Sequence, residues 1–241
     1  MYKYVFLDLD GTITESAPGI LSSARYALGK LGIPSGDAEK ERAFIGPPLT
    51  VGFRELYGLE GETLALAIRY YREYYIAGAY KDAPLYAGIE ETLQALHDDG
   101  KLLFVVTSKP KYIAEKVAAH FRLERFLSGV IGPDGEKNQS GKEELIEEAA
   151  TQVIGLLEEK GMAESLTLQD VYREAVMIGD RRYDMEAAKK LGLLAIGALY
   201  GYGSREELLE AGADHIAERP EDIVIYVGSG RNSGFLCLNS V

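Results

Sequence analysis

Two closely spaced acids, Asp8 and Asp10, end an apolar run near the start of the chain (YKYVFLDL, residues 2–9). A spacing of two residues places both carboxylates on one side of an extended strand. Acids at the end of a buried strand are costly unless a site compensates for their burial. One carboxylate can act as a nucleophile while the other transfers protons, which suits the stepwise cleavage of a phosphate ester. We therefore predict a catalytic pair, and the alternative is a solvated strand end.

A second acidic pair, Asp180 and Asp184, lies in the segment GDRRYD after another apolar run. Asp180 falls at the predicted strand end, and Asp184 falls in the first turn of the helix that follows. Asp180 alone could simply cap that helix. Together with the segment DLDGT at 8–12, however, these acids could converge on one hard cation with oxygen ligands, as Mg²⁺ prefers. The two pairs therefore predict a magnesium site.

The segment TSKP at 107–110 ends a third apolar run with two hydroxyl residues. A proline suits the first turn of the helix predicted to begin near Lys111. The free N–H groups of a helix N-terminus can bind phosphate oxygens, and Thr107 or Ser108 can donate a further hydrogen bond. An ordinary helix cap is the alternative interpretation.

The charge of the chain requires a local cation at any phosphate site. Lys and Arg number 26 against 38 Asp and Glu, a net charge of −12. This field repels nucleic-acid phosphates and anionic lipid, so neither is an expected partner, but it also repels a phosphorylated substrate. Lys142, which follows a polar loop at 133–141, could supply the positive charge. Lys109 and Lys137 compete for the same role.

Apolar runs and helical patterns alternate along most of the chain, which predicts an α/β fold with a Rossmann-like parallel sheet. In such a sheet, ligands bind at the carboxyl ends of the strands. The strands are predicted at 2–9, 101–108, 126–132, 175–180 and 192–199, and the helices at 89–98, 112–120, 142–160 and 184–191.

The first strand is followed by about 70 residues of mostly helical pattern with no convincing strand. This predicts an inserted helical cap at 15–83 and a discontinuous catalytic core at 1–14 and 84–241. Turn-rich segments at 16–19 and 82–88 are the hinge candidates. The predicted cap helices lie near 19–31, 50–57 and 63–77.

The remaining composition is that of an ordinary globular protein, with 46% hydrophobic and 27% charged residues. One cysteine, Cys237, fits a reducing compartment. The chain shows neither a signal-peptide pattern nor an apolar stretch long enough to span a membrane, so we expect a cytoplasmic protein. The tail after Asp222 contains a β-like run, to which we assign no function.

Four strand-end motifs in this order (DLDGT, TSKP, a lysine and GDRRYD) resemble those of the haloacid dehalogenase superfamily of phosphohydrolases, over residues 1 to about 216. The resemblance implies a HAD-like fold, with Asp8 as the nucleophile and Asp10 as the general acid and base. Thr107 would bind the transferred phosphoryl group, and Lys142 would be the family's lysine.

The same resemblance implies a Mg²⁺ cofactor. Asp8 and Asp180 would bind the metal by carboxylate and Asp10 by its backbone carbonyl, with Asp184 commonly in the surrounding layer. We expect further substrate contacts from Gly11, Thr12, Ser108, Lys109, Gly46 and Pro47.

At a finer level, FIGPPL at 44–49 and LYGYGSREEL at 199–208 look like the branch of phosphoglycolate phosphatase-like and 5'-nucleotidase-like proteins. The chain departs from that branch at Glu15, where Asp is usual, in a longer loop before Lys142, and in extra residues between Leu157 and Arg173. These departures leave the chemistry intact but bear on the assignment of the lysine.

Specificity is expected to come from the cap, because the core binds only the phosphoryl group. The rigid IGPPL loop could close over the leaving group, or its prolines could simply stop a helix. Four cap tyrosines could stack on a nucleobase, although ordinary packing is the favoured interpretation. Two cap arginines could meet a second anion but fit a solvated surface better, and the three histidines fit structural roles. These residues are Tyr70, Tyr71, Tyr74, Tyr75, Arg42, Arg54, His97, His120 and His215.

We therefore expect a magnesium-dependent phosphatase that hydrolyses a small phosphate monoester, such as phosphoglycolate or a nucleoside monophosphate, through an aspartyl phosphate on Asp8. One alternative is a phosphoryl transferase or mutase of the same fold, which tight exclusion of water would favour. Another is a non-catalytic module that binds phosphate.

Overall fold

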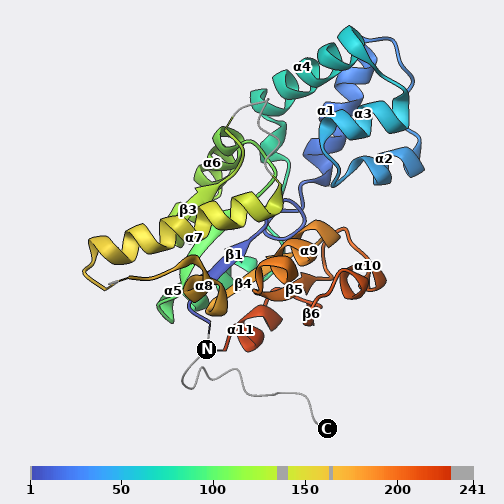
Figure 1. Cartoon of the computed structure of the whole chain (residues 1–241). Helices are drawn as coiled ribbons and strands as arrows, with labels where there is room; N and C mark the ends of the chain where they lie inside the picture. Colours follow the sequence, from blue (N-terminus) through green and yellow to red (C-terminus); the bar gives the residue numbers. More distant parts are fainter. Residues whose placement is uncertain (1, 135–140, 163–164, 229–241) are drawn as a thin grey trace.

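A parallel six-stranded sheet forms the centre of the fold (Figure 1). The computed structural model describes residues 2–134, 141–162 and 165–228. The strand order is β3-β2-β1-β4-β5-β6, so the order reverses between β1 and β4, as in a Rossmann-like fold. The strands are β1 (Tyr4–Leu7), β2 (Leu102–Val106), β3 (Leu127–Ile131), β4 (Ala175–Gly179), β5 (Leu194–Ala198) and β6 (His215–Ala217). The predicted α/β sheet is confirmed, and β6 adds a short strand that the sequence pattern did not indicate.

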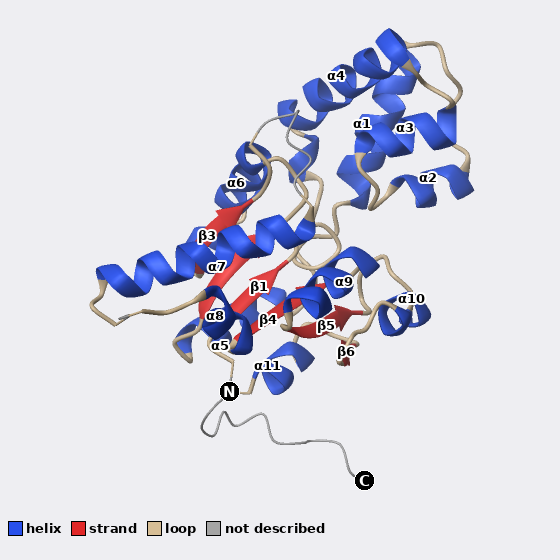
Figure 2. Ribbon diagram, in the orientation of Figure 1, coloured by secondary structure: helices blue, strands red, loops and turns tan. Residues whose placement is uncertain are grey.

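Helices cover both faces of the sheet (Figure 2). Successive side chains of a strand point to opposite faces, so Tyr4 and Phe6 of β1 pack in one core cluster and Val5 and Leu7 in the other. Residues of α7 (Lys142–Glu159), α8 (Leu168–Arg173) and α9 (Arg182–Leu191), with Leu208 of α10 (Arg205–Glu210), complete the first cluster. Residues of α5 (Ile89–Asp98), α6 (Lys111–His120), the 3₁₀ turn η2 (Leu123–Arg125) and α11 (Asp222–Val227) complete the second.

The chain between β1 and α5 forms a helical layer, here called the cap, above the carboxyl ends of the strands (Figure 1). It comprises α1 (Ala17–Lys30), α2 (Ala38–Phe44), α3 (Leu49–Tyr57), α4 (Gly61–Ala77) and the 3₁₀ turn η1 (Ala79–Lys81). Its own apolar cluster centres on four aromatic side chains, those of Phe44, Phe53, Tyr71 and Tyr75. The predicted absence of strands between residues 15 and 83 is confirmed, while the division of the chain into domains at 14/15 and 83/84 stays a prediction.

Two segments differ from the prediction. Residues 17–19 form the first turn of α1, where Pro18 is tolerated because that N–H has no helical partner, so the turn-rich character expected for 16–19 is wrong. The β-like run after Asp222 is helical, because the four-residue spacing of Ile223 and Val227 buries both against the sheet.

Among the described residues, no helix is long and apolar enough to cross a membrane.

Candidate active site

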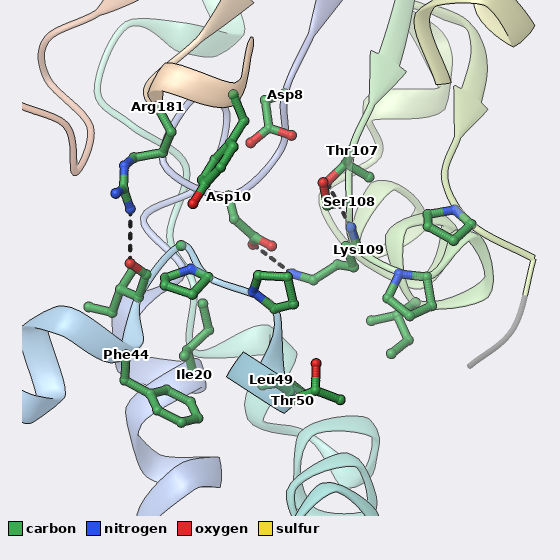
Figure 3. Close-up of a pocket in the computed structure, with 18 of the residues that line it drawn as sticks. Asp8, Asp10, Ile20, Phe44, Leu49, Thr50, Thr107, Ser108, Lys109 and Arg181 are labelled. Atoms are coloured by element: carbon green, nitrogen blue, oxygen red, sulfur yellow. Dashed lines mark hydrogen bonds and ion pairs between the residues drawn. The ribbon is translucent and has the colours of Figure 1, made fainter. Parts of the chain in front are cut away.

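Asp8 and Asp10 lie just beyond the carboxyl end of β1, next to the point where the strand order reverses. The backbone N–H of Asp8 donates to the carbonyl of Ile178 in β4 at 2.9 Å, so the strand pairing continues to Asp8. Both acids line one cavity, which has a volume of about 440 Å³ and lies between the core and the cap (Figure 3). The spacing of two residues therefore does bring both acids to the same cavity.

Asp180 follows β4 directly and is completely buried. Its Oδ2 accepts a hydrogen bond from the backbone N–H of Tyr202 at 2.9 Å, whereas its Oδ1 has no hydrogen-bond partner. The N-cap of α9 is Arg181, so Asp180 does not cap that helix. Asp184 takes part in the cap instead, since its Oδ2 accepts from the backbone N–H of Arg181 at 3.3 Å.

Carboxylate oxygens of Asp8, Asp180 and Asp184 lie within 4.8 Å of one another. Burial raises the pKa of Asp8 to about 6, against the opposing effect of Lys142, and the nearby carboxylate of Asp184 adds to the rise. Burial, followed by repulsion from Asp8 and Asp184, raises the pKa of Asp180 well above its ordinary value. A crowded set of oxygen donors that includes an unpartnered buried oxygen fits a divalent cation, which would relieve this repulsion.

Lys142 reaches this cluster from the first turn of α7 and is buried. Its Nζ donates to Oδ1 of Asp8 at 2.9 Å and to the carbonyl of Val106 at 3.0 Å, and it lies 2.7 Å from Oδ1 of Asp184. Burial acts to lower the pKa of Lys142, but the carboxylates of Asp184 and Asp8 outweigh it and raise the pKa above its ordinary value. The structure thus places a permanent positive charge beside the predicted nucleophile.

A second lysine, Lys109, lies beside the other acid of the pair. Its Nζ donates to Oδ1 of Asp10 at 2.6 Å, as Figure 3 shows, and to the hydroxyl of Tyr75 in the cap at 2.8 Å. Burial acts to lower its pKa, and Asp10 and Tyr75 raise it above the ordinary value. Two of the three candidate lysines therefore line the cavity with different carboxylate partners, while Lys137 lies outside the described residues.

Thr107 and Ser108 line the cavity where β2 ends. The Oγ1 of the buried Thr107 accepts a hydrogen bond from the backbone N–H of Lys109 at 3.2 Å, and α6 begins two residues later at Lys111. This local turn uses Thr107 as an acceptor, so its O–H can still donate to a phosphoryl oxygen. The N-cap of α6 is Pro110 and no side chain caps this helix, so the capping interpretation is wrong, whereas phosphate binding by Thr107 stays a prediction.

Gly11 and Thr12 are absent from the lining of the cavity. Gly11 has a φ of +86°, and a Cβ on it would lie 2.2 Å from Oδ2 of Asp180. Glycine is therefore required for the close approach of the DLDGT turn to Asp180. Substrate contact by these two residues stays a prediction.

The cap supplies the opposite wall of the cavity, including Gly46 and Pro47, whose contact with a substrate stays a prediction. Of the four cap tyrosines, Tyr71 and Tyr75 are buried, line the cavity and stack on each other with ring centroids 5.7 Å apart. Tyr74 instead stacks on Tyr26. Packing thus accounts for these rings, and two of them also shape the cavity.

The other residues considered from sequence lie elsewhere. Arg42, Arg54 and the three histidines, His97, His120 and His215, are exposed and absent from the cavity lining. Sequence reasoning missed several residues that line the cavity, among them Arg72, Arg181, Tyr183 and Tyr202. Arg181 and Tyr183 lie inside the GDRRYD motif, and Tyr202 lies inside LYGYGSREEL. Their positions in these motifs could therefore have indicated that they lie at the site.

The comparisons with known proteins agree with this geometry. A family model described as haloacid dehalogenase-like hydrolase matches residues 5–198. The chain therefore belongs to the haloacid dehalogenase-like hydrolase family, and it is a phosphatase of that family. It is similar to a 5'-nucleotidase from Pseudomonas aeruginosa, with 36% identity over 86% of this chain and 87% of the relative. It is also similar to a phosphoglycolate phosphatase from Vibrio cholerae, with 27% identity over 90% and 92% of the two chains.

Two further similarities extend this comparison. The structure of a predicted phosphatase from Clostridium acetobutylicum superposes with a TM-score of 0.79, with 37% identity over 94% of this chain and 98% of that one. The tyrosine-protein kinase PtkA from Mycobacterium tuberculosis is 32% identical over 83% of this chain, which spans 63% of that relative.

Proposed function

We propose that this protein is a magnesium-dependent phosphatase that hydrolyses small phosphate monoesters through a covalent intermediate on Asp8. The observation that carries the proposal is the buried ammonium of Lys142, which lies between Asp8 and Asp184 within a cluster of three carboxylates. A buried cation beside a nucleophilic carboxylate can hold an incoming phosphoryl group in a site where the surrounding acids would otherwise repel it.

In the first half of the proposed reaction, a carboxylate oxygen of Asp8 attacks phosphorus and forms an acyl phosphate as the bond to the leaving oxygen breaks. Asp10 gives its proton to that oxygen, so the product leaves as an alcohol. The ammonium of Lys142 and the hydroxyl of Thr107 bind the phosphoryl oxygens. A magnesium ion held by Asp8, Asp180 and the backbone carbonyl of Asp10, with Asp184 beside it, would supply further neutralisation of phosphoryl charge.

In the second half, Asp10 takes a proton from water, which attacks phosphorus and releases inorganic phosphate. The bond between phosphorus and the Asp8 oxygen breaks, and the carboxylate is restored. The Nζ of Lys109 donates to Oδ1 of Asp10 at 2.6 Å and holds the carboxylate in place. Asp10 thus acts first as an acid and then as a base.

The proposed substrates are phosphoglycolate, nucleoside monophosphates or similar small esters, in agreement with the names of the relatives. A cavity of about 440 Å³ leaves room beyond the phosphoryl group for a leaving group against the cap. The similarity to a tyrosine-protein kinase favours phosphoryl transfer as the second candidate. Transfer would use the same acyl phosphate, with an acceptor hydroxyl in place of water.

A panel of phosphate esters tests the proposal. We expect phosphate release from at least one nucleoside monophosphate, phosphoglycolate or small sugar phosphate in the presence of Mg²⁺, and loss of that release with EDTA, because the acids then repel the substrate. Inorganic phosphate is measured for each ester with and without added alcohol acceptors. Release that is indifferent to EDTA would contradict the magnesium requirement, and acceptor phosphate without inorganic phosphate would replace hydrolysis by transfer.

A further inference from the structure

One arginine joins the core to the cap at the edge of the cavity. Arg181 directly follows Asp180, and its Nε lies 2.9 Å from Oε1 of Glu207 on α10 of the core. Its Nη1 donates at 3.1 Å to the carbonyl of Ile45 in the cap, as the dashed line in Figure 3 shows. A single guanidinium therefore bridges two parts of the fold that are 136 residues apart in sequence.

The core end of this bridge is fixed. Oε1 of Glu207 also accepts the backbone N–H of Arg182 at 3.0 Å, so its carboxylate is held at the start of α9. The side chains of Arg181 and Glu207 are only 23% and 25% exposed. Water and salt therefore screen their attraction less than they would at an open surface. Glu207 thus orients the guanidinium fork toward the cap.

The cap end is shaped to receive a cation. Ile45 is the C-cap of α2, and carbonyls at a helix C-terminus carry partial negative charge. The next residue, Gly46, has a φ of +108°, and a Cβ on it would lie 1.9 Å from Nη1 of Arg181. The guanidinium occupies the space where any other residue would place its Cβ, so the loop and the guanidinium keep this contact only when the residue is glycine.

The loop held in this way is Ile45–Pro48, all four residues of which line the cavity. In Figure 3, Arg181 lies on the left and Lys109 on the right, with Asp10 between them and the loop that joins Phe44 to Leu49 below. Given the proposed phosphatase function, we propose that Arg181 is a positioning residue that fixes this loop over the leaving group. It acts through the loop and does not itself take part in the chemistry.

Two variants remove the bridge from opposite ends. Arg181→Ala removes the donor, and Gly46→Ala separates the loop from the guanidinium, because the added Cβ would occupy the position of Nη1. Arg182→Ala is the matched control, because Arg182 is the adjacent arginine, is exposed and pairs with Glu186 on its own helix. Two quantities are measured for each protein: KM and kcat with the best ester of the panel, and hydrogen–deuterium exchange of peptides covering the loop.

For Arg181→Ala and Gly46→Ala we expect an increase of about tenfold in KM, a smaller change in kcat and faster exchange confined to the loop, as for loss of one charge-assisted hydrogen bond. Arg182→Ala should match the wild type. A general loss of stability would instead accelerate exchange in β1 and β4 as well, and would contradict a positioning role. The proposal would also be overturned if Arg181→Ala had the same KM as the wild type and the same rate of hydrogen–deuterium exchange in the loop. Absence of phosphate release from the wild type would instead refute the proposed function, while loop exchange would still test the bridge.

Discussion

Replacing Asp8 by Asn is expected to lower the rate of phosphate release by at least about 10³-fold, because an amide cannot form the acyl phosphate. The change keeps the shape of the side chain and removes one charge from a crowded buried cluster. Since burial raises the pKa of Asp8 to about 6, its ionised form costs folding free energy at neutral pH. Without metal, the variant should therefore be at least as stable as the wild type.

The measurements are initial rates of phosphate release and urea unfolding of the metal-free protein at pH 7. Asp98→Asn is the control, because this exposed acid of α5 lies away from the cavity. Loss of activity together with a large loss of stability would point to misfolding. Full activity in Asp8→Asn would remove Asp8 from the mechanism.

Replacing Lys142 by Met is expected to affect activity and stability together. The variant leaves Asp8 and Asp184, two members of the three-carboxylate cluster, without their ammonium partner, and breaking a buried ion pair from one side costs about 3 to 5 kcal/mol. Activity should fall by at least about 10²-fold, because the ammonium proposed to bind the phosphoryl oxygens beside Asp8 is then lost. Urea unfolding without metal and phosphate release with Mg²⁺ provide the two readouts.

Lys190→Met is the matched control for this prediction. Lys190 pairs with Glu143 at 3.2 Å, but its side chain is 72% exposed, so its removal should change neither quantity measurably. If Lys142→Met behaved like Lys190→Met, the buried lysine would have neither the structural nor the catalytic role assigned to it.

The sequence predicted the site best where local pattern and topology agree. Apolar runs that end in DLDGT, TSKP and GDRRYD place their polar residues at one edge of a parallel sheet, so the cavity around Asp8, Asp10 and Thr107 follows from strand direction. The helical cap was likewise visible as a long interval with helical periodicity and no strand pattern.

What the sequence could not predict depends on contacts between distant segments. Nothing local pairs Lys109 with Asp10, 99 residues away, or Lys142 with Asp8, 134 residues away, so the choice among the lysines stayed open. The bridge from Arg181 to Ile45 is equally distant. The helix α11 was missed because its β-branched residues suggest a strand, whereas packing against the sheet favours a helix.

The covalent intermediate on Asp8 is tested most directly by chemical trapping. The enzyme is mixed with its best ester and Mg²⁺, quenched with borohydride, which reduces an acyl phosphate to an alcohol, and analysed by peptide mass spectrometry. We expect homoserine at position 8 that depends on substrate, with Asp10, Asp180 and Asp184 unchanged. Turnover with Asp8 intact, or reduction at another acid, would contradict the covalent intermediate on Asp8.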